Sequence, residues 1–199
     1  MCVQIKPIPR DVIDEIIHEI EVNNYHNYMP DWPAIRPSAF PKSEVGLIVP
    51  GEGGMVSCVK RWGYEVPWRV EPISNTRDDK ALIPEKMWFD SIHNRRCIIP
   101  TLGFYEPHKT EKTVSKKTGK PIKQQYFFEQ TDSPVTFIAG IYDKDYFSMM
   151  TTSPNATMKP VHDRMPLVLD VNELNRWLYG NFQALFDRSK IELTMSRVI

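Results

Sequence analysis

The 199-residue chain has no long hydrophobic run. No apolar stretch approaches the roughly 20 residues that a membrane-spanning helix needs. The N-terminal segment MCVQIKPIPRD also lacks the apolar stretch of a secretory signal. We therefore expect an intracellular, cytoplasmic protein.

Cysteine is scarce as well. The three cysteines, Cys2, Cys58 and Cys97, are widely separated and form no closely spaced pair of metal ligands. This excludes a disulfide framework and fits a reducing compartment. We expect no metal and no cofactor.

The formal net charge is zero, with 25 basic and 25 acidic residues. This argues against a protein that binds polyanions over its whole surface. The charges are unevenly distributed, however. Residues 95–125 contain eight Lys or Arg and two Glu, whereas residues 1–60 contain eight acidic and five basic residues. One concentrated basic face can still bind nucleic acid by neutralising phosphates.

Glycine is sparse and proline abundant, with nine Gly against seventeen Pro. This composition favours many short elements and rigid turns over a helical bundle. The length fits one domain, residues 1–199. Apolar spacing predicts a helix that starts at Pro9 and strands over the following ranges: 3–8, 44–49, 55–61, 125–130, 134–142 and 146–152. We expect the last three strands to form an antiparallel meander.

Other segments are less regular. Residues 25–43 read as an ordered surface loop, and residues 108–123, almost without apolar side chains, as a long hairpin tip or a mobile loop. Short helices are expected over 84–92, 172–179 and 182–187.

The first two residues, Met1-Cys2, suggest a specific chemistry. Removal of Met1 would leave an α-amine and a thiol on adjacent carbons of Cys2. The amine can condense with an aldehyde to an imine, and the thiol can then close a thiazolidine ring. Both groups titrate near neutral pH, at roughly 7.7–8.0 for the amine and about 8.5 for the thiol. The alternative is that Cys2 is only an early residue of a first strand.

Two other polar residues lie in suggestive surroundings. Glu106 follows an apolar run and sits among aromatics, where a carboxyl group tends to have a raised pKa and can act as acid or base. His162 is followed by Asp163 and Arg164, just before an apolar strand. Trp62 and Trp68 are either core residues or, if exposed, platforms on which bases stack.

Taken together, these motifs resemble the SOS response-associated peptidase (SRAP) family, the sensors of abasic sites in single-stranded DNA. The resemblance extends over most of the chain and rests on motifs that occur in order: Met1-Cys2, RWG with a following Trp, Asn75-x-Arg77, RRCIIPTLGFYEP, FIAGIY, MMTTSPN and PVHDRMPLVL.

The resemblance implies a fold and a mechanism. The fold would be α+β, with a largely antiparallel, barrel-like β core and peripheral short helices. Cys2 would capture the ring-opened abasic sugar as a thiazolidine, Asn75 would orient Cys2, and Glu106 and His162 would transfer protons. The implied DNA-binding residues are Arg77, Arg164, Trp62, Trp68 and Thr151. The implied partner is single-stranded DNA that contains abasic sites, and we expect a monomer.

The sequence departs from the family where Val3-Gln4 replaces the usual Gly-Arg, and Asp78-Asp79 makes the stretch after Arg77 unusually acidic. Three alternatives remain open at this stage. One is a cysteine–histidine peptidase or amidase with Cys2 as nucleophile and His162 as base. Another is a non-covalent single-stranded DNA-binding protein. The third is a zinc site formed by Cys2, Glu106 and His162.

Overall fold

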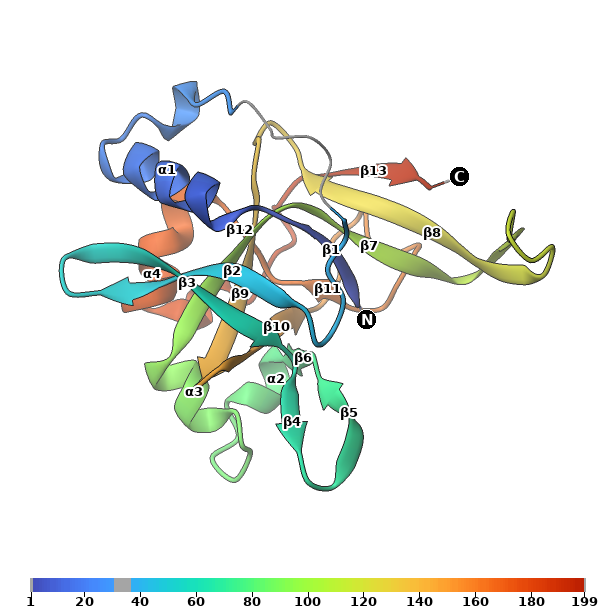
Figure 1. Cartoon of the computed structure of the whole chain (residues 1–199), viewed down its shortest axis with the longest axis horizontal. Coiled ribbons are helices and arrows are strands. Elements are labelled where there is room, and N and C mark those ends of the chain that lie inside the picture. Colours follow the sequence, from blue (N-terminus) through green and yellow to red (C-terminus); the bar gives the residue numbers. More distant parts are fainter. Residues whose placement is uncertain (1, 31–36, 199) are drawn as a thin grey trace.

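A single long strand, β7 (Arg96–Val114), organises the fold. The computed structural model describes residues 2–30 and 37–198, and in it β7 pairs with β1 (Gln4–Pro7), β2 (Glu44–Gly51), β8 (Pro121–Gln130) and β9 (Thr136–Asp143) (Figure 1). Because β1 pairs with the middle of this strand, the N-terminal residues are carried to the segment that contains Glu106.

The strand pairings close into a ring. β9 pairs with β10 (Tyr146–Thr152), β10 with β3 (Gly54–Trp62), β3 with β2, β2 with β7, and β7 again with β9. Most pairings are antiparallel, but β10 runs parallel to β3 and to β6 (Asn75–Arg77). This is the largely antiparallel, barrel-like core with short helices that the family resemblance implies.

Two apolar cores lie on the two faces of this sheet. Side chains alternate across a strand, so Ile98 and Ile99 of β7 enter different cores. One core contains Ile98 and packs beneath α1 (Arg10–Glu21), whose buried residues are Val12, Ile13, Ile16 and Ile17. The other contains Ile99 and Cys2. Cys2 is therefore part of a packed interior.

The remaining elements are short. They are η1 (Tyr25–Asn27), β4 (Tyr64–Val66), β5 (Arg69–Ile73), α2 (Asp78–Ala81), α3 (Phe89–Asn94), β11 (Met165–Pro166), β12 (Val168–Leu169), η2 (Val171–Glu173), α4 (Leu174–Tyr179), η3 (Phe182–Leu185) and β13 (Leu193–Arg197). No helix among the described residues is both long and apolar enough to cross a membrane.

Several predicted elements are confirmed: the helix after Pro9 and the strands around 3–8, 44–49 and 55–61. The expected meander is confirmed in part: β9 and β10 pair antiparallel as predicted, whereas β8 pairs with β7 and β13 rather than with β9. The helix expected over 84–92 covers Phe89–Asn94 instead. The hairpin tip expected over 108–123 is confirmed as the end of the β7–β8 hairpin, although much of the segment is strand. In the predicted loop 25–43, residues 31–36 lie outside the described part of the chain, as does Met1.

Candidate functional site

Cys2 lies just before β1 and is almost fully buried, with 1% of its surface exposed. Asn75 Nδ2 donates a hydrogen bond to the Cys2 carbonyl oxygen at 2.8 Å, and the Cys2 thiol lies 3.5 Å from the Gln4 carbonyl oxygen. Burial is the main reason that the pKa of the Cys2 thiol is raised to about 12, and the Glu106 carboxylate raises it further. The thiol is therefore neutral at physiological pH.

The position of Asn75 follows from strand pairing. β6 lies parallel to β10, with Asn75 opposite Met149 and Arg77 opposite Thr151. Side chains two residues apart on a strand share a face, so Asn75 and Arg77 point the same way while Thr76 is buried on the opposite face. The NTR tripeptide thus places one side chain on Cys2 and another toward solvent.

Glu106 is fully buried in β7, although it is a carboxylic acid. Burial raises its pKa from the usual value of 4.5, because removing a carboxylate from water disfavours its charged form. β1 pairs with this part of β7, with Gln4 opposite Tyr105, so Glu106 is next in sequence to a residue that faces the N-terminal segment. A buried neutral carboxyl group can donate a proton to a departing oxygen.

His162 brings a second titratable group to Glu106, with 3.7 Å between Nε2 and Glu106 Oε1. Its Nδ1 lies 3.1 Å from the Arg164 backbone nitrogen and 3.2 Å from the Arg164 carbonyl oxygen, which fixes the ring. Burial lowers the pKa of His162, so burial favours the neutral form of both partners. The structure therefore brings together four predicted site residues: Cys2, Asn75, Glu106 and His162.

The two predicted phosphate-binding arginines lie near this group, but each is paired with an aspartate. Arg77 donates two hydrogen bonds to Asp79, each of 2.8 Å. Arg164 Nη2 donates to Asp78 Oδ1 at 2.6 Å and to the Thr151 carbonyl oxygen at 2.5 Å. The sequence motifs did not identify the aspartates as functional, although their position directly after Arg77 is a signal of such pairing.

The other predicted DNA-binding residues differ in exposure. Trp68 is 73% exposed on the β4–β5 hairpin. Trp62 is fully buried and donates a hydrogen bond from Nε1 to the Ser74 carbonyl oxygen at 2.9 Å. Thr151 is also buried, and its hydroxyl donates to the Thr76 carbonyl oxygen at 3.3 Å. Trp62 and Thr151 are thus core residues of this structure, and stacking of bases on Trp62 does not fit its burial.

The zinc alternative finds no support in the geometry. Within residues 2–30 and 37–198, no group of three His, Cys, Asp or Glu side chains is arranged to hold a metal ion.

Solved structures share this fold. A crystal structure of a protein from Bacteroides thetaiotaomicron superposes with a TM-score of 0.70 at 19% identity, covering 100% of this chain and 92% of that chain. A second, from Bordetella bronchiseptica, gives a TM-score of 0.69 at 18% identity and covers 100% of both chains.

Sequence relatives carry a common name. The abasic site processing protein YoaM of Bacillus subtilis is 28% identical over 183 residues, which are 83% of this chain and 74% of the relative. The abasic site processing protein YMR114C of Saccharomyces cerevisiae is 31% identical over 123 residues, which are 55% of this chain and only 31% of the relative.

The family comparison covers most of the chain. The sequence model of the family "SOS response associated peptidase (SRAP)" matches residues 8–196, a range that begins after Cys2. The chain therefore belongs to the SRAP family.

Proposed function

We propose that this protein senses abasic sites in single-stranded DNA and captures them covalently through Cys2. The support is the convergence on one residue: Asn75 donates to the Cys2 carbonyl oxygen at 2.8 Å, and β1 pairs with the part of β7 that contains the buried Glu106. Membership of a family whose relatives are named abasic site processing proteins points to the same substrate.

The proposed reaction begins with hydrolysis of the Met1–Cys2 peptide bond, which the family's peptidase description suggests the chain performs itself. The freed α-amine attacks the C1 aldehyde of the ring-opened sugar. The resulting carbinolamine loses water to give an imine, with Glu106 as the proton donor for the departing oxygen. The Cys2 sulfur then bonds to the imine carbon, and its proton ends on nitrogen. Amine, aldehyde and thiol thereby yield a thiazolidine and one water molecule.

The remaining site residues have defined roles in this scheme. Asn75 holds the backbone of Cys2, which keeps the reacting amine and thiol in place and raises their effective concentration toward the aldehyde. His162, with Nε2 3.7 Å from Glu106 Oε1, acts as the second acid or base. Arg77 and Arg164 bind backbone phosphates, and Trp68 stacks on an unpaired base.

The thiol pKa favours this reaction over a cysteine–histidine hydrolase. Such hydrolases use a thiolate, whose pKa is lowered by a neighbouring positive charge. Here burial and Glu106 raise the pKa of the Cys2 thiol to about 12. Attack by the α-amine needs no thiolate, because the thiol adds only after the more electrophilic imine has formed.

Denaturing electrophoresis of the protein after incubation with single-stranded DNA carrying one abasic site tests the proposal. The natural protein should give a heat-stable adduct, and Cys2→Ser should give none, since its hydroxyl cannot form the thiazolidine. Cys58→Ala is the matched control, because it removes a free thiol elsewhere in the chain and should leave adduct formation unchanged. Equal adduct from Cys2→Ser would refute the proposal.

A further inference from the structure

The ends of β7 and β8 form a two-stranded arm that extends away from the barrel (Figure 1). The arm consists of residues 112–123, in which Lys112 pairs with Lys123 and Val114 with Pro121. Two-stranded hairpins bury little apolar surface and contribute little to a core. Val114 is 63% exposed, so the arm is not explained by packing within the chain.

The turn at the end of the arm is ordered by its own hydrogen bonds. The Ser115 amide donates to the Lys120 carbonyl oxygen at 2.9 Å, and the Gly119 amide donates to the Ser115 carbonyl oxygen at 2.8 Å. Gly119 has φ of +67°, a conformation that glycine adopts without strain. The side chains of the turn are therefore presented from a defined backbone.

Five exposed lysines lie along the arm: Lys112, Lys116, Lys117, Lys120 and Lys123. Among the described residues none of them forms an ion pair with a carboxylate. The nearby Glu111 is already engaged, because it accepts hydrogen bonds from Tyr126 and Arg197, each of 2.7 Å. The arm thus carries uncompensated positive charge in a chain whose net charge is zero.

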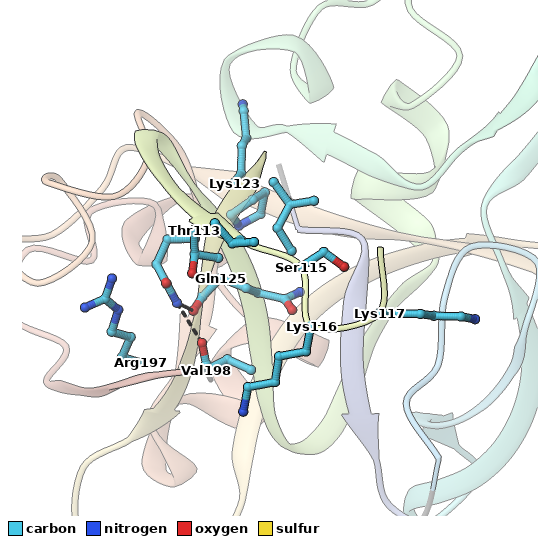
Figure 2. Close-up of a pocket in the computed structure, with 12 residues that line it drawn as sticks. Thr113, Ser115, Lys116, Lys117, Lys123, Gln125, Arg197 and Val198 are labelled. Carbon is cyan, nitrogen blue, oxygen red and sulfur yellow. Dashed lines mark hydrogen bonds between the residues drawn. The ribbon is translucent and has the colours of Figure 1, made fainter. Parts of the chain in front are cut away.

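The direction of the side chains indicates what kind of anion they fit. A concavity of about 700 Å³ lies between the arm and the C-terminal strand, and Lys116, Lys123 and Arg197 are among its lining residues. Figure 2 shows that the side chains of Lys116, Lys117 and Lys123 point in different directions. Diverging ammonium groups do not surround one small anion, but they suit a polymer with repeated negative charges.

The root of the arm is joined to the candidate site. Between Pro107 and Lys112 the pairing is interrupted by a bulge, where the Lys109 amide donates to the Val161 carbonyl oxygen at 2.9 Å. Lys109 Nζ also lies 3.1 Å from Asp163 Oδ1, so the bulge contacts the residues on both sides of His162. Burial raises the pKa of Glu106, and the charge of Lys123 opposes that shift. The arm therefore begins beside the residues that flank His162.

We infer that the β7–β8 arm is a second nucleic-acid contact that binds the phosphate backbone of DNA flanking the lesion. It supplies affinity without reading sequence and without taking part in the covalent step. The inference rests on the proposed function only in taking DNA as the polyanion, and it is tested on undamaged DNA, so it stands or falls independently of Cys2.

The test uses a triple variant, Lys116→Gln with Lys117→Gln and Lys120→Gln, which leaves the root of the arm intact. The matched control removes three exposed lysines elsewhere: Lys86→Gln, Lys144→Gln and Lys190→Gln. Fluorescence anisotropy gives the affinity of each protein for an undamaged single-stranded oligothymidylate over a series of salt concentrations. Circular dichroism verifies the fold.

Each phosphate contact with a single strand contributes about 0.7 to the slope of log affinity against log salt. The arm variant should therefore lose about 2 from the slope and bind at least about fivefold more weakly at low salt. The control should stay within about twofold of the natural protein. Equal losses of affinity in the two variants would mean that net charge, and not the position of the arm, determines binding. Unchanged affinity in the arm variant would overturn the inference.

Two further results would also contradict it. Arm-dependent binding of polyglutamate or of phosphatidylserine vesicles, without arm-dependent binding of DNA, would assign the arm to an acidic protein or a membrane. In crosslinking assays, the arm variant should need more abasic DNA for half-maximal rate and reach the same maximal rate. A lower maximal rate would place the arm in the covalent step instead.

Discussion

Asn75 Nδ2 donates a hydrogen bond of 2.8 Å to the carbonyl oxygen of Cys2, 73 residues earlier in the chain. The contact exists because β1 joins β7 while β6 joins β10, and the closed ring of strands brings these two edges together. It positions the backbone of the residue whose amine and thiol are proposed to react.

Asn75→Ala should slow abasic-site crosslinking, because the Cys2 backbone loses its side-chain donor. A typical hydrogen bond is worth about 0.5–1.5 kcal/mol, so the single-turnover rate should fall about 2- to 13-fold. Ser74→Ala is the control, since it removes the other acceptor of Asn75 Nδ2, at 3.1 Å, and leaves the contact with Cys2 in place. Equal rates for Asn75→Ala and the natural protein would contradict the positioning role.

Asp79→Asn should strengthen DNA binding, because it releases Arg77 from a two-bond ion pair at the surface. We expect affinity for undamaged single-stranded DNA to rise about two- to fivefold at low salt, which is the scale of exposed ion pairs. Asp90→Asn makes the same charge change beside Arg95 on α3 and should have a smaller effect. A similar gain in both variants would mean that overall charge, not Arg77, is responsible.

Substitution of the two tryptophans should affect different properties, stability for Trp62 and DNA binding for Trp68. Trp62→Ala removes a buried indole and its hydrogen bond to Ser74, and should lower the free energy of unfolding by about 3–5 kcal/mol. Trp68→Ala should change that free energy by less than about 0.5 kcal/mol, yet weaken binding of single-stranded DNA. Urea denaturation and anisotropy measure the two effects. Normal DNA affinity in Trp68→Ala would remove this residue from the binding surface.

Glu106 should make stability depend on pH. Burial raises its folded-state pKa above the usual value of 4.5, so between these two values the native state binds more protons than the unfolded state. Stability from this group is fully present below pH 4.5 and is lost as the pH rises through the folded pKa. As the pH rises through this range, the free energy of unfolding of the Glu106→Gln variant should therefore fall less than that of the natural protein. Chemical denaturation at a series of pH values measures the difference. Parallel stability curves would contradict the raised pKa.

Local pattern was enough to predict much of the fold. The apolar stripe of Val12, Ile16 and Ile20 predicts α1, and the PGEGG turn predicts the β2–β3 hairpin, because both signals come from neighbouring residues. One half of the meander, the pairing of β9 with β10, is confirmed. The other half is wrong, because β7 and β9 are both neighbours of β8 in the chain and periodicity does not show which of them pairs with it. β13, a five-residue strand that pairs with β8, was missed entirely.

The candidate site, too, was predicted in part: the motifs identify residues but not their surroundings. Motifs identified Cys2, Asn75, Glu106 and His162, and these four converge in the structure. The motifs did not predict that Trp62 is buried or that Arg77 and Arg164 are paired with Asp79 and Asp78. Burial and ion pairing depend on the complete surroundings of a side chain, and the residue type alone does not determine them.

The most direct test of covalent capture is the mass of the N-terminal peptide after reaction with an abasic oligonucleotide and digestion of protein and DNA. Covalent capture predicts a peptide that begins at Cys2, lacks Met1 and carries the sugar remnant with loss of one water, with both the amine and the thiol blocked. An N-terminal peptide that keeps Met1 and a free thiol, or a sugar remnant attached to a lysine, would contradict it.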